Sequence, residues 1–204
     1  QYPDDRAGWA RRAERAAPRI LQLEASRGEP IGLIFSSSPP ASAHALGERL
    51  SREFDLPWIA DFRDLWTDNP DYRAPRWRLA LDRRLEQRWL SSATGIVTVT
   101  DSWRQLLALR RRSGAPLAFI PNGYDEADFS GNAVSKAPSD VFTLVHTGTF
   151  YGPRDPAALL EGVSRYLDSP GQGRPALRVR LVGNMGARFR AEAADPVQDD
   201  VRAA

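Results

Sequence analysis

The chain has 204 residues, of which 42% are hydrophobic and 26% are charged, and this composition fits a folded protein of one or two domains. Its 28 basic side chains nearly balance its 26 acidic ones, so the charge gives no reason to expect a nucleic-acid partner. The absence of cysteine, with only His44 and His146 as imidazoles, argues against disulfides and a zinc site. No apolar run approaches the roughly 20 residues that span a bilayer, and the first residues are not a signal peptide. We therefore expect a cytoplasmic location.

Short apolar segments alternate with helical patterns along the chain. The first helical pattern, residues 5–27, is amphipathic, and we expect it to cover one face of a sheet. Strands are predicted at 31–36, 56–61, 95–99, 117–120, 141–146 and 176–183, and further helices at 41–54, 77–90, 102–112 and 155–167. Alternation of this kind predicts βαβ units, and so an α/β fold with a parallel sheet and helices on both faces.

Local signals predict where several of these elements end. The serines and prolines of residues 36–40 could cap the helix at 41–54, Thr100 or Asp101 could cap the helix at 102–112, and Gly114 would end that helix. The apolar run at 117–120 reads as a buried strand, and the Pro121-Asn122-Gly123 sequence that follows predicts a turn.

A change in composition predicts two domains. Residues 128–140 are mostly small or polar, and a new apolar strand follows them. We interpret residues 1–129 as one domain, 130–140 as a linker and 141–204 as the beginning of a second domain of the same type.

In open parallel sheets, ligands bind beyond the carboxyl ends of the strands. This rule selects the loops at 36–39, 61–64, 100–101, 122–123, 146–149 and 183–184. In one of them, Asp61 and Asp64 flank Arg63, an arrangement that could hold sugar hydroxyls or a phosphate; an ion pair that only fastens the loop is the alternative. In another, Gly148 allows close backbone approach and Arg154 precedes a helix start, which together could hold a diphosphate.

The helix predicted at 77–90 has two interpretations. Its arginines and its tryptophans, Trp77 and Trp89, could contact anionic lipid. Its leucines and Trp89 could instead pack against the sheet, and we favour packing.

Six segments in this order resemble the glycosyltransferase family 4 group of enzymes with the GT-B fold. They are S-S-S-P-P at 36–40, D-F-R-D-L-W at 61–66, I-V-T-V-T at 96–100, I-P-N-G-Y-D at 120–125, H-T-G-T-F-Y-G at 146–152 and L-V-G at 181–183. The resemblance implies two Rossmann-like domains, with an acceptor bound mainly by the first and a nucleotide-sugar mainly by the second. It also implies sugar transfer with retention of configuration, without a cofactor or a catalytic metal, in the biosynthesis of a glycan, glycolipid or cell-envelope polysaccharide.

The resemblance also assigns residues to roles. Asp61 and Arg63 would line the reaction centre. Three residues would lie on the acceptor side: Ser37, Ser38 and Asp64. Four would lie on the donor side: Gly148, Thr149, Arg154 and Gly183. The partners would be a nucleotide-sugar and a saccharide or lipid-linked acceptor, with peripheral membrane contact at the inner face through the 77–90 helix.

The chain departs from the family pattern in several places. Where many relatives have an arginine after the loop glycine and a lysine before the helix, this chain has Thr149 and Asp155, and Arg154 would substitute. No Gly-rich first strand precedes Asp5, and no paired glutamates follow Asn184. We expect a piece of a longer transferase that is inactive alone. The alternatives are a sugar- or nucleotide-binding module without catalysis, and another GT-B-like enzyme such as an epimerase.

Overall fold

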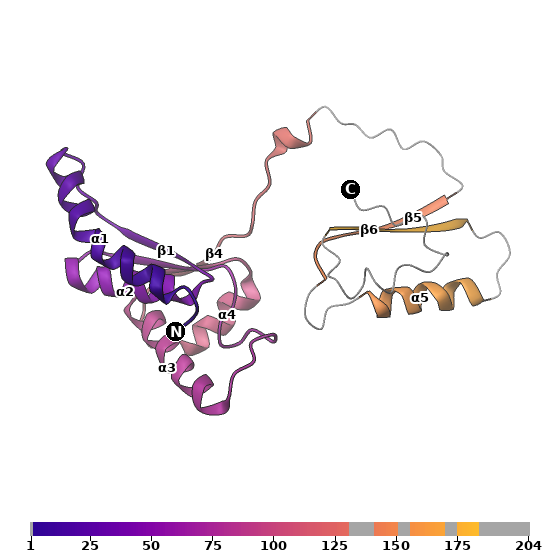
Figure 1. The fold of residues 1–204 in the computed structure, drawn as a ribbon, viewed down its shortest axis with the longest axis horizontal. Coiled ribbons are helices and arrows are strands. Elements are labelled where there is room, and N and C mark those ends of the chain that lie inside the picture. The colour runs from indigo at the N-terminus through magenta and orange to yellow at the C-terminus, as the bar shows by residue number, and fades with distance from the viewer. Residues whose placement is uncertain (1, 131–140, 151–155, 170–174, 184–204) are drawn as a thin grey trace. The chain divides into compact units, whose positions relative to one another are not determined.

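The computed structural model describes residues 2–130, 141–150, 156–169 and 175–183. It divides the chain into two compact units, Gln1–Asp128 and Phe129–Ala204 (Figure 1). Most of the predicted linker lies outside the described residues, as does Arg154. Each unit is described by itself.

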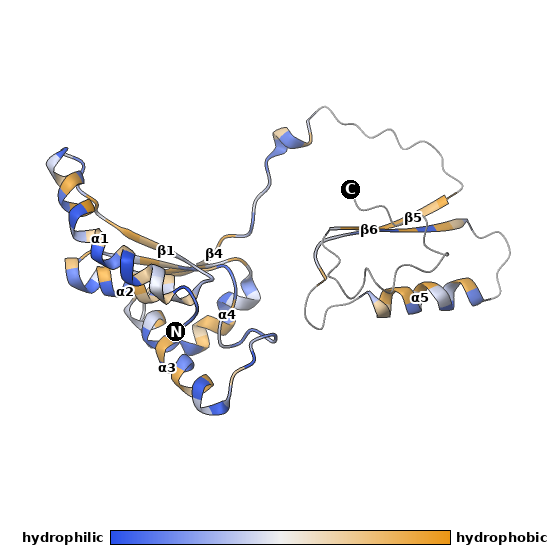
Figure 2. Ribbon diagram, in the orientation of Figure 1, coloured by the Kyte–Doolittle hydropathy of each residue, from blue (hydrophilic) through white to orange (hydrophobic). Residues whose placement is uncertain are grey.

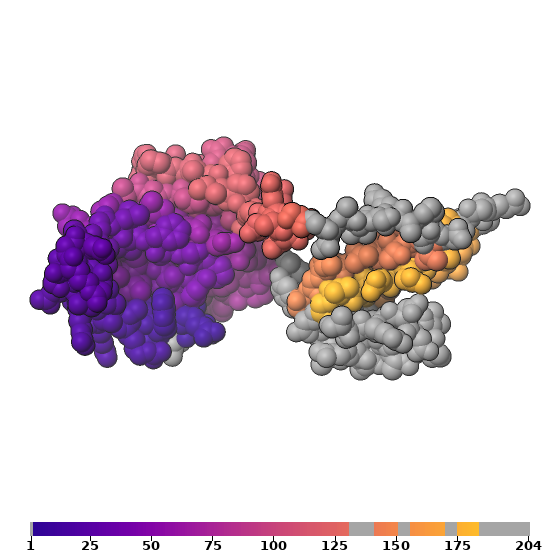
Figure 3. Space-filling view, turned by 90° about the horizontal axis from the view of Figure 1, so that it is seen from above, coloured from indigo at the N-terminus to yellow at the C-terminus, as the bar shows by residue number. Residues whose placement is uncertain are grey.

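The first unit alternates helices and parallel strands. Its elements are α1 (Ala7–Ser26), β1 (Ile34–Ser38), α2 (Ala41–Phe54), β2 (Trp58–Phe62), α3 (Arg76–Ser92), β3 (Gly95–Thr98), α4 (Asp101–Arg110) and β4 (Leu117–Phe119), followed by a short 3₁₀ turn at Glu126–Asp128. The strands pair in the order β1-β2-β3-β4, all parallel. The space-filling surface in Figure 3 accordingly runs from indigo to pink in chain order across this unit. The predicted α/β class with a parallel sheet is confirmed.

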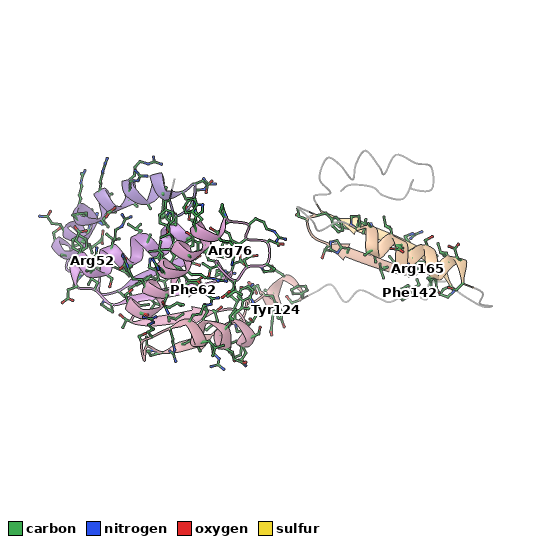
Figure 4. All side chains as sticks on the ribbon, turned by 90° about the horizontal axis from the view of Figure 1, so that it is seen from below. Arg52, Phe62, Arg76, Tyr124, Phe142 and Arg165 are labelled. Carbon is green, nitrogen blue, oxygen red and sulfur yellow. The ribbon has the colours of Figure 1, made fainter. Side chains whose placement is uncertain are left out.

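The connecting helices build the core of this unit. Helices α2, α3 and α4 contact one another in sequence and lie on one side of the strands in Figure 1. The largest fully buried side chains are those of Trp58, Trp89 and Phe62, and Figure 4 labels Phe62. Because side chains alternate between the faces of a strand, Trp58, Ala60 and Phe62 face this helix layer, and Asp61 faces the other way.

The first helix packs chiefly against α2, so the expectation that it covers one face of the sheet is wrong. Asp4, just before this helix, tethers the start of α2. Its Oδ2 accepts a hydrogen bond of 2.7 Å from the backbone N–H of Ser42, and its Oδ1 accepts one of 2.8 Å from the backbone N–H of Arg6. The predicted capping by the serines at 36–38 is therefore wrong. A carboxylate from a distant segment supplies the negative group that a helix N-terminus favours.

Of the other predicted element ends, one is confirmed and the rest are wrong. Thr100 caps α4, since its hydroxyl accepts a 3.2 Å hydrogen bond from the Trp103 N–H, as predicted. The predicted stop at Gly114 is wrong, because α4 ends at Arg110 and the chain continues as extended backbone.

The fourth strand is not buried: it lies at the sheet edge, and Phe119 is 46% exposed. The predicted turn at 121–123 is also absent, and the chain there runs without a hydrogen-bonded turn.

The second unit contains one βαβ repeat. Strands β5 (Val141–Thr147) and β6 (Ala176–Val182) pair in parallel, and α5 (Ala157–Asp168) lies between them in sequence. Each of the three elements falls within a few residues of its predicted position. Among the described residues of both units, no helix is long and apolar enough to cross a membrane.

Candidate functional site

The polar residues predicted from the family resemblance meet at the carboxyl edge of the four-stranded sheet. Ser37 and Asp61 are partners in the β1–β2 register, and the Ser37 hydroxyl donates a 2.8 Å hydrogen bond to Oδ2 of Asp61. Both side chains lie on the face opposite the helix layer, because they alternate with the buried Ser36 and Phe62. The structure thus joins one predicted acceptor residue to one predicted catalytic residue.

Arg63 links the ends of two strands that are not neighbours. Its backbone N–H donates to the carbonyl of Ser38 at 3.0 Å, and its guanidinium Nη2 donates to Oδ1 of Asn122 at 2.6 Å. Since Asn122 follows β4 and Arg63 follows β2, the contact passes across the end of β3. Arg63 forms no ion pair with Asp61 or Asp64, all of them described residues, so the alternative interpretation, an ion pair within this loop, is wrong. The sequence signal at Asn122 was interpreted as a turn, and its contact with Arg63 was missed.

The other two predicted acceptor residues have opposite environments. Ser38 is only 3% exposed and faces the helix layer, so its side chain is closed to an acceptor in this structure. Asp64 is exposed to solvent. Of these two residues, Asp64 alone has a side chain that a ligand can reach.

The loop after β2 is fastened to two helices. The side chain of Thr67 donates a 2.5 Å hydrogen bond to Oε2 of the buried Glu86 on α3, and Arg110 on α4 pairs with Asp68. Burial raises the pKa of Glu86, and the hydrogen bonds from Thr67 act against this. These contacts hold the segment that begins with Asp61 against α3 and α4.

Aromatic packing extends this support into the core. The Trp66 ring stacks on the Trp89 ring of α3, with centroids 5.1 Å apart and an angle of 21° between the planes. An offset stack of this kind stabilises beyond the buried area alone. The first four residues after β2 are therefore anchored at both ends.

The helix-covered face contains a second polar group, which is closed to solvent. Nε1 of Trp58 donates to Oγ of Ser36 at 2.8 Å, and Ser36 Oγ lies 2.8 Å from Nδ1 of His44. The Ser36 hydroxyl therefore bridges Trp58 and His44, and Nε2 of His44 is buried with no hydrogen-bond partner among the described residues. Burial lowers the pKa of His44 to about 3, so the ring is neutral at neutral pH. His44 is a structural hydrogen-bonding residue.

In the second unit, two predicted donor-side glycines lie side by side. The Gly148 N–H donates to the carbonyl of Val182 at 2.9 Å. Gly148 and Gly183 have φ angles of 152° and 139°, and a Cβ on Gly183 would lie 1.8 Å from the Gly148 carbonyl oxygen. Gly183 therefore requires glycine because the two loops approach closely, and Gly148 favours glycine because of its positive φ. The adjoining Thr149 is exposed.

The first unit is a Rossmann-like α/β domain, and its carboxyl edge presents a carboxylate, a hydroxyl and a guanidinium within one connected set of loops. These groups can accept hydrogen bonds from sugar hydroxyls and donate them to an anionic oxygen.

The model of the glycosyl transferase 4-like domain matches residues 2–123, which is more than half of the chain and includes all four strands of this sheet. The chain belongs to this glycosyltransferase family, with a GT-B-like fold. A search of curated proteins found no significant match.

Proposed function

We propose that the protein moves a sugar from a nucleotide-sugar donor to an acceptor hydroxyl, with retention of configuration and without a metal ion. The observation that supports this proposal best is the Ser37–Asp61 hydrogen bond beside the Arg63–Asn122 contact, inside the segment that matches the family. The acceptor is a saccharide or a lipid-linked saccharide, and the reaction belongs to glycan or glycolipid biosynthesis on the cytoplasmic side.

In the proposed reaction, the bond between sugar C1 and the donor diphosphate breaks, and a bond from C1 to the acceptor oxygen forms on the same face of the sugar. The acceptor proton leaves with the diphosphate. Asp61 stabilises the positive charge that develops at C1, and Arg63 stabilises the negative charge on the leaving group. The Ser37 hydroxyl donates its hydrogen bond to Asp61, so its oxygen accepts a hydrogen bond from the acceptor hydroxyl. Asp64 accepts from a second acceptor hydroxyl.

The donor side of the proposal rests on the second unit. The backbone around Gly148 and Gly183, together with the exposed Thr149, approaches the diphosphate at the carboxyl edge of β5 and β6. Arg154, outside the described residues, supplies a cation there. Backbone N–H groups at a strand–helix turn suit an anionic oxygen.

The test compares two carboxylate variants of the protein encoded by the complete gene. Asp61→Asn keeps the shape of the side chain and removes its charge, and we expect kcat/KM for transfer to fall at least about a hundredfold. The matched control, Glu53→Gln, removes an exposed carboxylate near the end of α2, just before β2 begins and so at the amino edge of the sheet rather than its carboxyl edge, and should leave kcat/KM unchanged. NMR of the glycosidic product reports retention, and the reaction should survive a chelator.

Full activity in Asp61→Asn would refute the role of this carboxylate. Saturable binding of a nucleotide-sugar with no transfer to any acceptor would instead favour the binding-module alternative. An altered free sugar as product would favour an epimerase-like enzyme.

A further inference from the structure

The inner and outer faces of α3 carry opposite charges. Asp82 and Glu86, the two acidic residues of this helix, are both buried on its inner face, where Trp89 also lies. The outer face exposes Trp77, which is 67% exposed, and Leu81, which is 45% exposed. The packing interpretation from the sequence therefore holds for Leu85 and Trp89, which belong to the core, but not for the exposed Leu81.

The two buried carboxylates of α3 accept hydrogen bonds from neighbouring side chains. Asp82 accepts hydrogen bonds from the Tyr72 hydroxyl at 2.5 Å and from Nε of Arg78 at 3.3 Å, and Glu86 accepts from Thr67. Arg78 also donates to the carbonyl of Pro3 at 2.6 Å. These contacts hold the negative charges of the helix away from its exposed surface.

Arg88 of α3 pairs with Glu48 of α2, and the other arginines of this region point to solvent. They are Arg73, just before α3, and Arg76, Arg83 and Arg84 within it; all four are exposed, and Arg76 marks the start of the helix in Figure 4. No ion pair joins any of them to a carboxylate in the part of the chain that the structure describes. The outer surface is accordingly positive, with apolar side chains between the charges, as the mixed blue and orange of α3 in Figure 2 indicates.

The spacing places the apolar and basic groups on one stripe. Trp77, Leu81 and Arg84 are separated by four and three residues, so they lie along the same side of the helix. An arginine-rich helix with exposed Trp and Leu fits the boundary between lipid headgroups and acyl chains. Guanidinium groups bind phosphate through paired hydrogen bonds, and the indole ring suits the interfacial depth.

We propose that the α3 outer face, defined as Arg73, Arg76, Trp77, Leu81, Arg83 and Arg84, binds the surface of a membrane that contains anionic phospholipids. The arginines contact lipid phosphates, and Trp77 and Leu81 insert between the headgroups. A nucleic acid would be attracted by the same charges, but it offers no apolar layer for Leu81. This inference uses only the charge and exposure of α3, so it does not depend on the transferase chemistry.

The test measures sedimentation of the 204-residue chain with vesicles. We expect binding to phosphatidylcholine vesicles that contain phosphatidylglycerol, little binding to phosphatidylcholine alone, and release at about 1 M salt, where the Debye length falls to about 3 Å. Replacing Arg73, Arg76, Arg83 and Arg84 with Gln should weaken binding at least about tenfold. Replacing Trp77 and Leu81 with Ser, which leaves the charge intact, should weaken it about tenfold as well.

The matched control replaces four exposed arginines of α1 with Gln: Arg11, Arg12, Arg15 and Arg19. It removes the same charge, and its binding should fall less than about threefold. An equal loss in this control would show general attraction to the chain and would overturn the assignment to α3. Equal binding to neutral vesicles, unchanged binding of the Trp77→Ser, Leu81→Ser variant, or tighter binding to a DNA duplex than to vesicles would also overturn it. Circular dichroism of each variant verifies folding.

Discussion

The two faces of the four-stranded sheet use similar polar side chains in different ways. On the face covered by helices, Ser36 joins Trp58 to His44, and all three side chains are closed to solvent. On the opposite face, Ser37 binds Asp61 at the carboxyl edge, where the loops of the candidate site begin. Neighbouring serines of one strand thus serve the core and the site. The comparison teaches that strand alternation, rather than residue type, decides which polar group stabilises the fold.

The largest expected effect on the covered face is at Gly47 in α2. A Cβ at this position would lie 2.6 Å from Nε1 of Trp58 and 2.9 Å from Oγ of Ser36, so Gly47→Ala should lower the free energy of unfolding by about 2–3 kcal/mol. The sign is informative because Ala in a helix interior usually stabilises relative to Gly. Urea denaturation measures the change.

Gly162 in α5 supplies the control for this substitution. Nothing lies within 4 Å of a Cβ built there, and Gly162→Ala should raise stability by about 0.5–1 kcal/mol. If Gly47→Ala behaved like Gly162→Ala, the close packing of α2 on the Trp58–Ser36 hydrogen bond would be contradicted.

The second expected effect is a loss of stability in acid caused by His44. Its pKa is about 3 in the folded chain against about 6.5 when unfolded, so below pH 6.5 the unfolded state binds more protons. Stability should therefore fall as the pH falls, by about 2 kcal/mol between pH 7 and pH 5 from this group. Urea unfolding at a series of pH values measures it.

His44→Gln removes the titrating group and retains an acceptor for Ser36, so it should flatten the pH dependence over this range. His146→Gln, at the only other histidine, serves as the control and should keep the wild-type slope. A wild-type slope in His44→Gln would contradict the assignment to His44.

The contrast between the faces also explains what the sequence could predict. Apolar periodicity located every described strand and helix, because Trp58, Phe62 and Ile96 are buried along their strands and this burial is written in the hydropathy pattern. The rule that ligands bind beyond parallel strands selected Ser37 and Asp61 together, since strand ends in a parallel sheet share an edge.

Contacts between distant segments were not predictable in this way. Asp4 bonds to Ser42, 38 positions away, and Arg63 bonds to Asn122, 59 positions away. No local sequence pattern indicates either pair. The inward position of the α3 carboxylates was not predicted, for a related reason. Asp82 points inward only because Tyr72 and Arg78 are held beside it, whereas helix hydropathy alone would turn leucines inward and carboxylates outward.

The neighbouring serines should give the sharpest separation of the faces, and Ser37→Ala should have the smallest effect on stability. Ser36→Ala leaves the Trp58 indole N–H and His44 Nδ1 buried without their shared partner, and it should cost about 1–3 kcal/mol of stability. Ser37→Ala removes one hydrogen bond from Asp61 at a partly exposed position, and it should cost less than about 1 kcal/mol. Thermal and urea unfolding of the two variants, which delete the same hydroxyl one residue apart, give the difference directly.

The two serine variants should differ in activity in the opposite sense: Ser37→Ala should lose more activity than Ser36→Ala. If Ser37 orients Asp61 and meets the acceptor, Ser37→Ala should raise KM for the acceptor and lower kcat/KM by about tenfold, with stability nearly unchanged. Ser36→Ala should retain kcat/KM at a temperature where it stays folded, because its hydroxyl lies on the other face and touches no site loop. A loss of activity that follows stability in both variants would mean that the two faces are not functionally distinct. A loss of activity confined to Ser37→Ala would assign the Ser37–Asp61 contact to the reaction. The two variants delete the same hydroxyl and differ only in the face of β1 on which it lies.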